Sequence, residues 1–441
     1  ANRSDSNELW YWSLIGYAGV ILAAPYYLIR MAVADKYRAG LRQRLALFSP
    51  EEKQRLQQGP WIWIHTVSVG ELMAARPLLQ RIKTDFPQYK ILVSTVTDTG
   101  QNVARTLDEV DQAIYLPLDL YPLCQKIMRW IAPACLLIME TELWPNFIRS
   151  AAAMNIPCFL VNARLSDKSF KNYARFQSFF KPLLRRFSKI LTQSGEDRRR
   201  FLEIGAPTGI LSVMGNIKFE ALPQIDDGAL RSLWRKRFGI QDDEILLLCG
   251  STFPGEESIL ARVSAALRKE NIPVRLVIAP RHIERTEAIL EELKPIEYPM
   301  VRRSNLRDNQ IIQPDSIILL DTIGELRHVY AAADIVFMGK SLCGKGGQNP
   351  IEAAAWGKPV LYGKNMQNFR DIAALFTRAG AARNVETEQD LLDCCRRLCK
   401  DAEERSQMGR KAFAVVQDNQ GALERIIETV QPFLQKANQS G

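Results

Sequence analysis

Histidine is scarce in this chain of 441 residues, and no two cysteines have the C-x-x-C spacing. The three histidines, His65, His282 and His328, lie far apart in the sequence. Because zinc sites draw on clusters of these two residue types, we expect no metal site and no cofactor. The eight cysteines are scattered, which indicates reduced thiols in a cytosolic compartment: Cys124, Cys135, Cys158, Cys249, Cys343, Cys394, Cys395 and Cys399.

Two phosphate-binding signatures are also missing. The sequence contains neither the G-x-x-x-x-G-K-[ST] motif of P-loop enzymes nor the G-x-G-x-x-G motif of dinucleotide-binding enzymes. Their absence disfavours ATPases and dehydrogenases. No low-complexity tract or short-period repeat is present, which argues against a disordered chain and against a repeat array.

Length and composition predict two globular domains. A chain of 441 residues exceeds what one hydrophobic core usually serves, and a hydrophobic content of 47% suffices for two. Apolar runs alternate with helical segments in each half, the pattern of a doubly wound parallel sheet. We expect one domain at residues 46–212, a linker at 213–228 and a second domain at 229–441. The predicted strands are residues 61–64, 91–96, 113–116, 136–139, 158–161, 190–192, 245–249, 274–278, 317–320, 335–338 and 359–361.

Residues 1–45 are predicted to attach the chain to a membrane. Residues 9–29 are almost uncharged and are about as long as a helix that crosses a hydrocarbon core. Basic residues follow, which predicts that the body of the protein faces the cytoplasm near anionic lipid: Arg30, Lys36, Arg38, Arg42 and Arg44. No small-residue cleavage site follows, which disfavours a signal peptide. Whether the segment crosses the bilayer or lies in its interface stays open.

A second basic and aromatic stretch covers residues 168–189. Apolar side chains recur there at roughly helical spacing, with lysines and arginines between them. Pro182 should interrupt or kink the helix. The stretch predicts either a surface for acidic lipid headgroups or a core-facing helix with a solvated basic side. The residues concerned are Phe170, Tyr173, Phe176, Phe179, Phe180, Leu183, Leu184 and Phe187, with Lys171, Arg175, Lys181, Arg185, Arg186 and Lys189 between them.

Glu71 is the first candidate for catalysis. It follows the strand-like run at residues 61–64 and precedes a helical segment, so we expect it on a strand-to-helix turn. In open parallel sheets such turns form the ligand crevice, where a carboxylate can take a proton from a bound hydroxyl. The alternative is an acid that merely complements the positive end of the helix.

Three loops of the second half are suited to a phosphate. The first, at residues 250–257, offers free backbone amides and a hydroxyl at a helix N-terminus. The second brings a guanidinium and an imidazole to a strand end. The third is rich in glycine and should supply bare amides, although a tight turn would explain each glycine equally well. The candidate residues are Ser251 and Thr252, Arg281 and His282, and Gly346, Gly347, Asn349 and Glu352.

Seven segments together resemble one enzyme family. They are His65-Thr-Val-Ser-Val-Gly-Glu71, Met139-Glu-Thr-Glu-Leu-Trp-Pro145, Asn162-Ala-Arg-Leu-Ser166, Gly215-Asn-Ile-Lys218, Pro280-Arg-His282, Asp321-Thr-Ile-Gly-Glu-Leu326 and Gly346-Gly-Gln-Asn-Pro-Ile-Glu352. Their order resembles that in the Kdo (3-deoxy-D-manno-oct-2-ulosonic acid) transferases of lipopolysaccharide and lipid A biosynthesis. The resemblance runs from the N-terminal anchor nearly to the end of the chain.

The resemblance implies a GT-B glycosyltransferase, in which two Rossmann-like domains face a cleft. The first domain would bind the acceptor and the second the nucleotide sugar. Kdo would pass from CMP-Kdo to the lipid A precursor, lipid IVA, with inversion at the anomeric carbon. The expected place is the cytoplasmic side of the bacterial inner membrane, with an anionic membrane surface as partner and no nucleic acid.

The resemblance also implies roles for individual residues. Glu71 would be the general base. One of Glu140 and Glu142 would orient the acceptor or steady the surroundings of Glu71, with a helix-capping acid as the alternative. Further contacts to substrates are expected from Ser68, Gly70, Arg164 and Lys218, in addition to the loop residues of the second half. Two departures from the usual pattern, Gln348 and Ala353, concern the donor side. A nucleotide-sugar epimerase of the same fold and a non-catalytic lipid-binding protein remain as alternatives.

Overall fold

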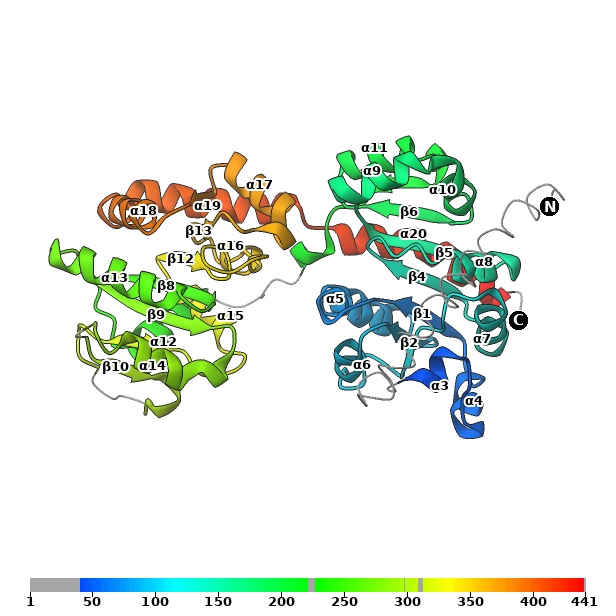
Figure 1. Ribbon diagram of the computed structural model, residues 1–441, viewed down its shortest axis with the longest axis horizontal. Helices are drawn as coiled ribbons and strands as arrows, with labels where there is room; N and C mark the ends of the chain where they lie inside the picture. Colours follow the sequence, from blue (N-terminus) through cyan, green and yellow to red (C-terminus); the bar gives the residue numbers. More distant parts are fainter. Residues whose placement is uncertain (1–39, 221–226, 297, 308–311, 440–441) are drawn as a thin grey trace. The chain divides into compact units, whose positions relative to one another are not determined.

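The computed structural model describes residues 40–220, 227–296, 298–307 and 312–439 (Figure 1). Contacts divide these residues into two compact units. Unit 1 comprises residues 40–220 and 420–439, and unit 2 comprises the described residues between 227 and 419. Each unit has its own parallel sheet flanked by helices, which confirms the predicted class of two doubly wound α/β units.

Unit 1 contains a parallel sheet with the strand order β3-β2-β1-β4-β5-β6-β7. The strands are β1 Trp61–His65, β2 Lys90–Thr95, β3 Gln112–Tyr115, β4 Cys135–Met139, β5 Cys158–Ala163, β6 Lys189–Thr192 and β7 Leu211–Val213. The helices are α3 Leu41–Arg44, α4 Pro50–Leu56, α5 Val69–Asp85, α6 Asp98–Ala104, α7 Tyr121–Ile131, α8 Pro145–Ala153, α9 Asp167–Arg175, α10 Gln177–Leu184, α11 Gly195–Glu203 and α20 Ala422–Gln439, with 3-10 turns η2 Thr208–Ile210 and η3 Ile217–Glu220.

The order of strands in unit 1 reverses at β1, whose neighbours are β2 and β4. In open sheets of this kind, ligands bind outside the carboxyl ends of the strands at the point of reversal. The loops after β1 and β4 are therefore the expected ligand edge of unit 1.

Both faces of the unit 1 sheet are buried, because successive side chains of a strand point to opposite sides. Trp61 and Trp63 pack with α7 and α8 on one face. Ile62 and Ile64 pack with α5 and α20 on the other face. The near-continuous apolar runs in the sequence follow from this double burial.

The C-terminal helix α20 belongs to unit 1, so the expectation that the second domain continues to residue 441 is wrong. Ile426, Val430 and Leu434 of α20 are buried in the core of unit 1. Tyr89 Oη donates a hydrogen bond of 2.8 Å to the carbonyl oxygen of Leu434. Residues 213–220, which we assigned to the linker, also belong to unit 1, and residues 221–226 of the predicted linker lie outside the described residues.

Unit 2 contains a second parallel sheet, with the order β10-β11-β9-β8-β12-β13-β14. The strands are β8 Ile245–Thr252, β9 Val274–Pro280, β10 Met300–Arg302, β11 Ile317–Leu319, β12 Ile335–Met338, β13 Val360–Gly363 and β14 Ala382–Val385. The helices are α12 Asp227–Arg237, α13 Glu256–Lys269, α14 Thr286–Leu293, α15 Leu326–Val329, α16 Ile351–Ala354, α17 Arg370–Arg378, α18 Glu388–Lys400 and α19 Ala402–Asp418, with 3-10 turns η4 Ile283–Arg285, η5 Arg303–Asn305, η6 Tyr330–Ala332 and η7 Gln367–Phe369. The order reverses at β8, between β9 and β12.

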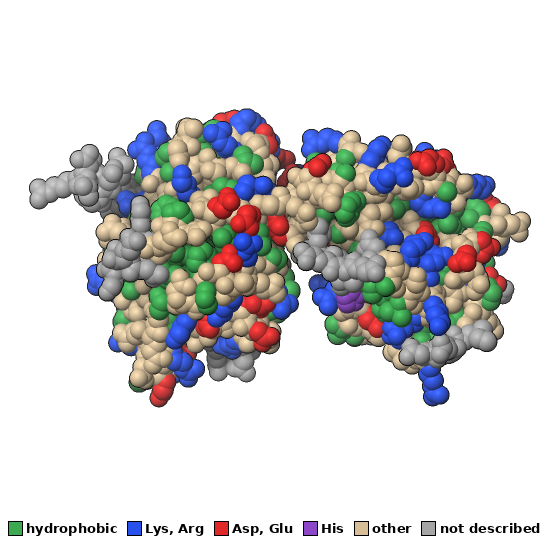
Figure 2. All heavy atoms as spheres, turned by 180° about the vertical axis from the view of Figure 1, so that it is seen from behind, with side chains coloured by type: hydrophobic (Ala, Val, Ile, Leu, Met, Phe, Trp, Pro, Cys, Tyr) green, Lys and Arg blue, Asp and Glu red, His purple; other side chains and the backbone are tan. Residues whose placement is uncertain are grey.

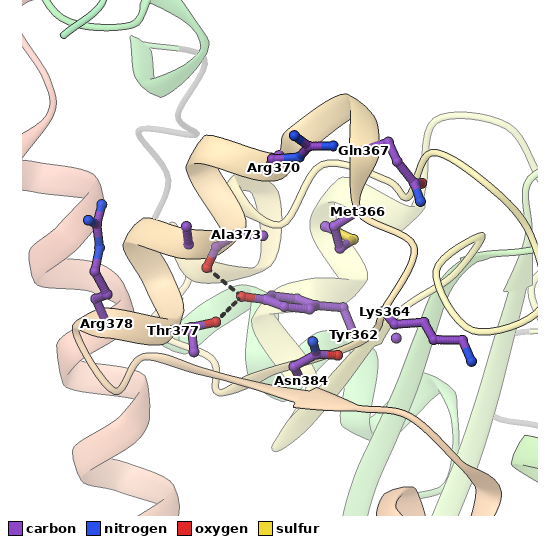
Figure 3. Close-up of a pocket in the computed structure, with 11 residues that line it drawn as sticks. Tyr362, Lys364, Met366, Gln367, Arg370, Ala373, Thr377, Arg378 and Asn384 are labelled. Carbon is purple, nitrogen blue, oxygen red and sulfur yellow. Dashed lines mark hydrogen bonds between the residues drawn. The ribbon is translucent and has the colours of Figure 1, made fainter. Parts of the chain in front are cut away.

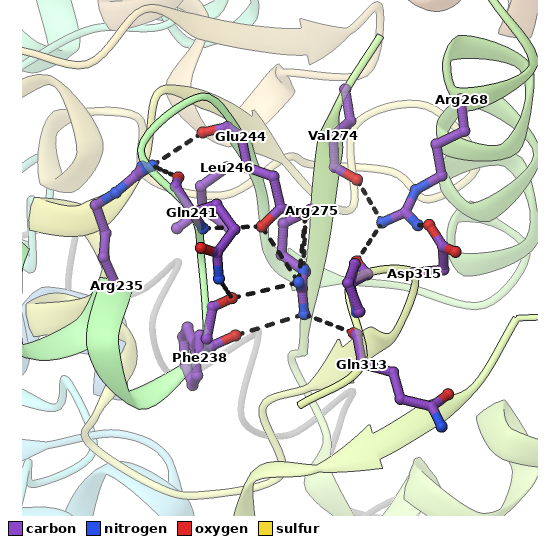
Figure 4. Close-up of polar contacts among 12 residues, drawn as sticks. Arg235, Phe238, Gln241, Glu244, Leu246, Arg268, Val274, Arg275, Gln313 and Asp315 are labelled. Atoms are coloured by element: carbon purple, nitrogen blue, oxygen red, sulfur yellow. Dashed lines mark hydrogen bonds and ion pairs between the residues drawn. The ribbon is translucent and has the colours of Figure 1, made fainter. Parts of the chain in front are cut away.

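A buried ion pair braces unit 2 (Figure 4). The Arg275 side chain on β9 is fully buried and contacts both carboxylate oxygens of Glu244 at 3.2 Å. It also donates to the carbonyl oxygens of Phe238 and Gln313. Because a buried guanidinium needs such partners, this network fixes the segment before β8 against β9.

The helix predicted at residues 168–189 is divided at a different place from the one we expected. The break lies at Phe176, between α9 and α10, whereas Pro182 lies inside α10. Phe170, Tyr173 and Phe180 pack against the core of unit 1, and Leu183 is buried in it. Phe176 is 56% exposed, so this stretch has both a core face and an apolar residue in solvent.

The predicted membrane segment at residues 9–29 lies outside the described residues. Within the described ranges, no helix combines the length and hydropathy needed to cross a bilayer. On the face drawn in Figure 2, basic and acidic side chains are interspersed over both units.

Candidate active site

Glu71 lies at the carboxyl edge of the unit 1 sheet, as the sequence predicted. It is in the first turn of α5, just after the N-cap residue Ser68. Ser68 Oγ lies 3.5 Å from the backbone nitrogen of Glu71 and 3.5 Å from Oε1 of its carboxylate. Ser68 therefore caps the helix that carries Glu71. Gly70 has room for a side chain, because a Cβ there would meet only Ser68 Oγ, at 3.9 Å.

The carboxylate of Glu71 has a raised proton affinity. Burial raises the pKa of Glu71 to about 7; the backbone N–H of Val67 opposes this shift, and the charges of Glu140 and Glu142 add to it. An exposed acid that only complemented a helix N-terminus would be stabilised in its charged form. A general base works best when its pKa is close to the operating pH, so Glu71 combines a suitable place with a suitable proton affinity.

Glu140 directly follows β4 in a left-handed backbone conformation, with φ of 56°. Its carboxylate bridges two cations: Arg164 Nε lies 3.1 Å from Oε2, and Lys218 Nζ lies 3.6 Å from Oε1. The hydroxyl of Thr141 also donates to the carbonyl oxygen of Arg164, at 2.5 Å. Glu140, whose charge acts on Glu71, therefore holds two basic side chains.

Glu142 lies in the same loop and is half-buried. Burial raises its pKa, and the charge of Glu140 adds to this effect. Burial, with a contribution from Glu142, also raises the pKa of Tyr173 on α9. The structure thus brings the three predicted acids together and adds Tyr173, which sequence reasoning had placed only in the aromatic stretch.

Several buried polar atoms at this edge lack a hydrogen-bond partner among the described residues. They are His65 Nε2, Thr66 Oγ1, Gln101 Nε2 and Asn162 Nδ2. Burial lowers the pKa of His65 to about 3, so its ring is neutral. Buried polar groups are nearly always paired in folded proteins, so these atoms need a partner that the described residues do not supply. Sequence analysis did not single out Thr66 or Gln101 as site residues.

In the first phosphate loop predicted in unit 2, a side chain of the loop itself binds one backbone amide, that of Phe253, together with four amides of the loop after β12. Glu256 is fully buried and accepts the backbone N–H groups of Lys340, Ser341, Leu342, Cys343 and Phe253. The bond to Ser341 is 2.9 Å long. These amides are therefore not free for an anion, and Glu256 instead ties the loop after β8 to the loop after β12.

The glycine-rich loop is also different from the prediction. The N–H of Gly346 donates to Gln367 Oε1 at 2.8 Å, and the N–H of Gly347 donates to the carbonyl oxygen of Lys340 at 3.0 Å. Both glycines have positive φ, and a Cβ on either would collide with Asn368 or Met366. The expectation of bare amides at these two positions is therefore wrong, because Gln367 binds the amide of Gly346 and the carbonyl oxygen of Lys340 binds that of Gly347.

The other predicted site residues of unit 2 differ in how far their side chains are exposed to solvent. The hydroxyl of Thr252 donates a hydrogen bond of 2.9 Å to buried Glu257. Thr252 therefore stabilises the fold, and the structure does not support the prediction that it contacts a substrate. Ser251 is half-exposed, with φ of 55°.

Arg281 and His282 are exposed just after β9. Asn349 Oδ1 accepts the N–H of Ile351 at the start of α16. Burial raises the pKa of Glu352, and Asn349 and the charge of Arg281 oppose this shift, so the second and third loops lie near each other.

A cavity of about 410 Å³ lies beside the glycine-rich loop, between β13, β14 and α17 (Figure 3). The basic side chains that line it are Lys364, Arg370 and Arg378, and no acidic residue of the described chain is among its lining. Tyr362 Oη is fixed in it by a bond of 2.7 Å to the carbonyl oxygen of Ala373. Met366 and Gln367 connect the cavity to Gly346 and Gly347. This cavity could have been recognised in the sequence from the basic residues spaced along residues 364–378, which the sequence analysis did not single out.

Over the described ranges, no three histidine, cysteine, aspartate or glutamate side chains gather in a way that could hold a metal ion. The described cysteines are free thiols, and most of them are buried.

The chain is similar to known transferases. A family model described as 3-deoxy-D-manno-octulosonic-acid transferase (kdotransferase) matches residues 39–221. A 3-deoxy-D-manno-octulosonic acid transferase of Haemophilus influenzae is 32% identical over 412 residues, which cover 91% of this chain and 93% of the relative.

Solved structures match the chain in fold. A UDP-GlcNAc 2-epimerase from Neisseria meningitidis bound to UDP-GlcNAc aligns with a TM-score of 0.57 at 15% identity, over 84% of this chain and 100% of that one. A glycosyltransferase from Rickettsia africae aligns with a TM-score of 0.56 at 12% identity, over 86% of this chain and 99% of that one. At these identities the likeness concerns the fold, and it agrees with the predicted GT-B pattern of two Rossmann-like units.

Proposed function

Because the chain belongs to the family of 3-deoxy-D-manno-octulosonic acid (Kdo) transferases, we propose that it moves Kdo from CMP-Kdo to the lipid A precursor, lipid IVA, with Glu71 as the general base. Membership in this family makes it a glycosyltransferase. The observation that carries the proposal is the place of Glu71 in the first turn of α5, at the carboxyl edge of the unit 1 sheet, where burial raises its pKa to about 7.

The reaction needs a base for the acceptor hydroxyl and stabilisation for the departing phosphate. In our proposal, Glu71 takes the hydroxyl proton while the oxygen attacks the anomeric carbon of Kdo from the side opposite CMP. The carbon–oxygen bond to CMP breaks, and the configuration at the anomeric carbon inverts. The leaving phosphate is already an anion, so it needs cations and N–H donors rather than a general acid.

Unit 2 supplies the basic side chains that we assign to the donor. Arg281 and His282 are exposed at the end of β9. Lys364, Arg370 and Arg378 line the cavity beside the glycine-rich loop. An excess of positive charge in one cavity favours an anionic ligand, such as a sugar nucleotide. We therefore assign CMP-Kdo to this edge of unit 2, with Ser251, Asn349 and Glu352 as neighbouring polar groups.

Unit 1 supplies the groups that we assign to the acceptor. Arg164 and Lys218 are held by Glu140 close to the proposed base. Glu142 and Tyr173 lie in the same cluster. Paired cations beside a base suit a sugar hydroxyl that is flanked by an acidic group.

We further propose that the protein works at the cytoplasmic face of the bacterial inner membrane. The support is the apolar segment at residues 9–29, the basic residues after it, and the helices α9 and α10. Lys171 and Arg175 are exposed on α9, Arg185 is exposed at the C-cap of α10, and Phe176 is exposed between the two helices. Basic residues around an exposed aromatic side chain favour binding to anionic lipid.

Mass spectrometry of the lipid tests the proposal. The wild-type protein is incubated with CMP-Kdo and lipid IVA dispersed in detergent. We expect the lipid to gain the mass of one or more Kdo residues while CMP is released. An unchanged lipid would contradict the proposal, and release of CMP without any acceptor would point to a different reaction of the donor.

A further inference from the structure

Asn162 occupies an irregular place at the end of β5. The pairing of β5 with β6 shifts between Leu160 and Ala163, so β5 has one extra residue there. Asn162 lies in this bulge with a positive φ of 56° and is almost fully buried. Bulges of this kind redirect a side chain, often next to an active site. Here the redirected Asn162 Oδ1 accepts the backbone N–H of Ile217 at 3.1 Å.

Two further amide side chains connect Asn162 to the segment after β7. Gln193 Nε2 donates to the carbonyl oxygen of Asn162 at 2.9 Å. Gln193 Oε1 accepts from Asn216 Nδ2, also at 2.9 Å. Asn216 Oδ1 in turn accepts the backbone N–H of Lys218 at 3.0 Å. We call Asn162, Gln193 and Asn216 the amide network.

The amide network ends at the backbone of a residue that points into the candidate active site. Ile217 and Phe219 are buried on either side of Lys218, which fixes the short turn η3. The side chain of Lys218 then reaches Glu140, which also binds Arg164. These contacts connect the segments that follow the carboxyl ends of β4, β5, β6 and β7.

We propose that Asn162, Gln193 and Asn216 are positioning residues, whose amide network holds Lys218 beside Glu140 so that Lys218 and Arg164 form one binding site for an acidic group of a substrate. The inference deepens the proposed function and rests on it for the identity of the substrate. The acidic group is a phosphate or a carboxylate, and it belongs either to the sugar donor or to the acceptor.

The need for such a network follows from the chemistry of lysine. Its ammonium group sits on a flexible chain of four carbons, so an isolated lysine loses much conformational freedom when it binds an anion. Fixing the backbone on both sides and pairing the ammonium with Glu140 removes part of that cost before the substrate arrives. Arg164, whose guanidinium is rigid, needs less support of this kind.

The first experiment measures the position of Lys218 independently of catalysis. Wild-type protein and the Asn216→Ala variant are treated briefly with acetic anhydride, and acetylation of Lys218 is compared with that of the other lysines by mass spectrometry. Loss of the network should free the ammonium group and speed its acetylation at least ~3-fold. Equal acetylation of Lys218 in the two proteins would overturn the proposal.

A matched control separates positioning from general loosening of the strands. Ser188 Oγ accepts the N–H of Cys158 at 3.3 Å, at the amino ends of β5 and β6 and away from the site. The Ser188→Ala variant should leave the acetylation of Lys218 unchanged. Faster acetylation of Lys218 in this control as well would mean that the strands, and not the amide network, hold the lysine.

The second experiment is a double-mutant cycle on transfer. KM for CMP-Kdo and KM for lipid IVA are measured for wild type, Asn216→Ala, Lys218→Met and the double variant. If Asn216 acts through Lys218, each single variant should raise one of the two KM values about 10-fold, and the double variant should be no worse than Lys218→Met. The KM that rises identifies the substrate that carries the acidic group.

The outcomes of the two experiments remain distinct. Unchanged KM values, or independent additive losses in the double variant, would overturn the proposed role of the network. A wild-type protein that transfers no Kdo would instead refute the proposed function, while the acetylation experiment would still decide how Lys218 is held.

Discussion

The carboxylate of Glu71 accepts the backbone N–H of Val67 across 2.7 Å. This bond turns one carboxylate oxygen back toward the loop after β1, while burial and the neighbouring acids keep the proton affinity of the group high. A fixed carboxylate whose pKa is about 7 can accept a proton from a substrate and release it to water near neutral pH.

The first prediction concerns the pH dependence of transfer. Glu71 must be deprotonated to act as a base, so kcat/KM should fall as the pH drops through about 7. Glu142→Gln removes one negative charge near Glu71 and should move this midpoint to lower pH, because the charge of Glu142 helps to raise the pKa. Initial rates measured between about pH 4 and pH 9 in roughly half-unit steps resolve such a shift. A midpoint near 4.5 in the wild type, the ordinary value for glutamate, would mean that the pKa of Glu71 is not raised.

The second prediction concerns stability. The pKa of Glu71 is raised in the folded state, so ionisation favours the unfolded chain, and the destabilisation appears as the pH rises above the ordinary value of 4.5 and is complete above about 7. Glu71→Gln should therefore raise the free energy of unfolding by about 2 kcal/mol at pH 8 and leave it nearly unchanged at pH 4. Urea unfolding at the two pH values measures this difference. A variant that is less stable than wild type at pH 8 would mean that the carboxylate is not strained by its surroundings.

The third prediction concerns the buried carboxylate of unit 2. Glu256→Ala removes the acceptor of five backbone N–H groups in the loops after β8 and β12, so it should lower the free energy of unfolding by at least ~3 kcal/mol. Glu291→Ala is the control, since its side chain is 69% exposed and pairs only with Lys294 among the interactions described. That variant should change stability by less than ~0.5 kcal/mol. Similar losses in the two variants would show that the five hydrogen bonds to Glu256 contribute little to the free energy of unfolding.

The predicted strands were confirmed where the sequence carried a strong signal. Each is a run of apolar residues because the sheets are buried on both faces. The strands that the sequence did not reveal, β7, β10 and β14, are short edge strands. Their residues are only partly buried, so no continuous apolar run marks them.

Sequence reasoning succeeded with Glu71 because a strand followed closely by a helix fixes the place of the turn between them. It failed with Gly346 and Gly347, because glycine amides can serve the fold as readily as a ligand, and only the positions of Lys340 and Gln367 decide which. It also failed with α20. An amphipathic helix shows that it covers a sheet, but its sequence does not show which of two similar sheets it covers.

The fourth prediction concerns the membrane. Replacing exposed Lys171, Arg175 and Arg185 with glutamine should weaken binding to anionic vesicles by about 1 kcal/mol per charge, and the loss should shrink as salt is added. Replacing Arg397, Lys400 and Arg410 on α18 and α19 removes the same charge from unit 2 and should have less effect. Vesicle sedimentation compares the two variants. Equal losses would mean that α9 and α10 provide only nonspecific positive charge.

The most direct measurement is the rate of Kdo transfer by Glu71→Gln. Glutamine keeps the size of the side chain but cannot take the proton, so turnover of CMP-Kdo and lipid IVA should fall at least ~100-fold while the circular dichroism spectrum stays that of the wild type. Glu196→Gln serves as the control, because Glu196 is likewise an acid in the first turn of a helix, α11, in unit 1. The account predicts a large loss for Glu71→Gln and a small one for Glu196→Gln, whereas near-native turnover by folded Glu71→Gln would contradict it.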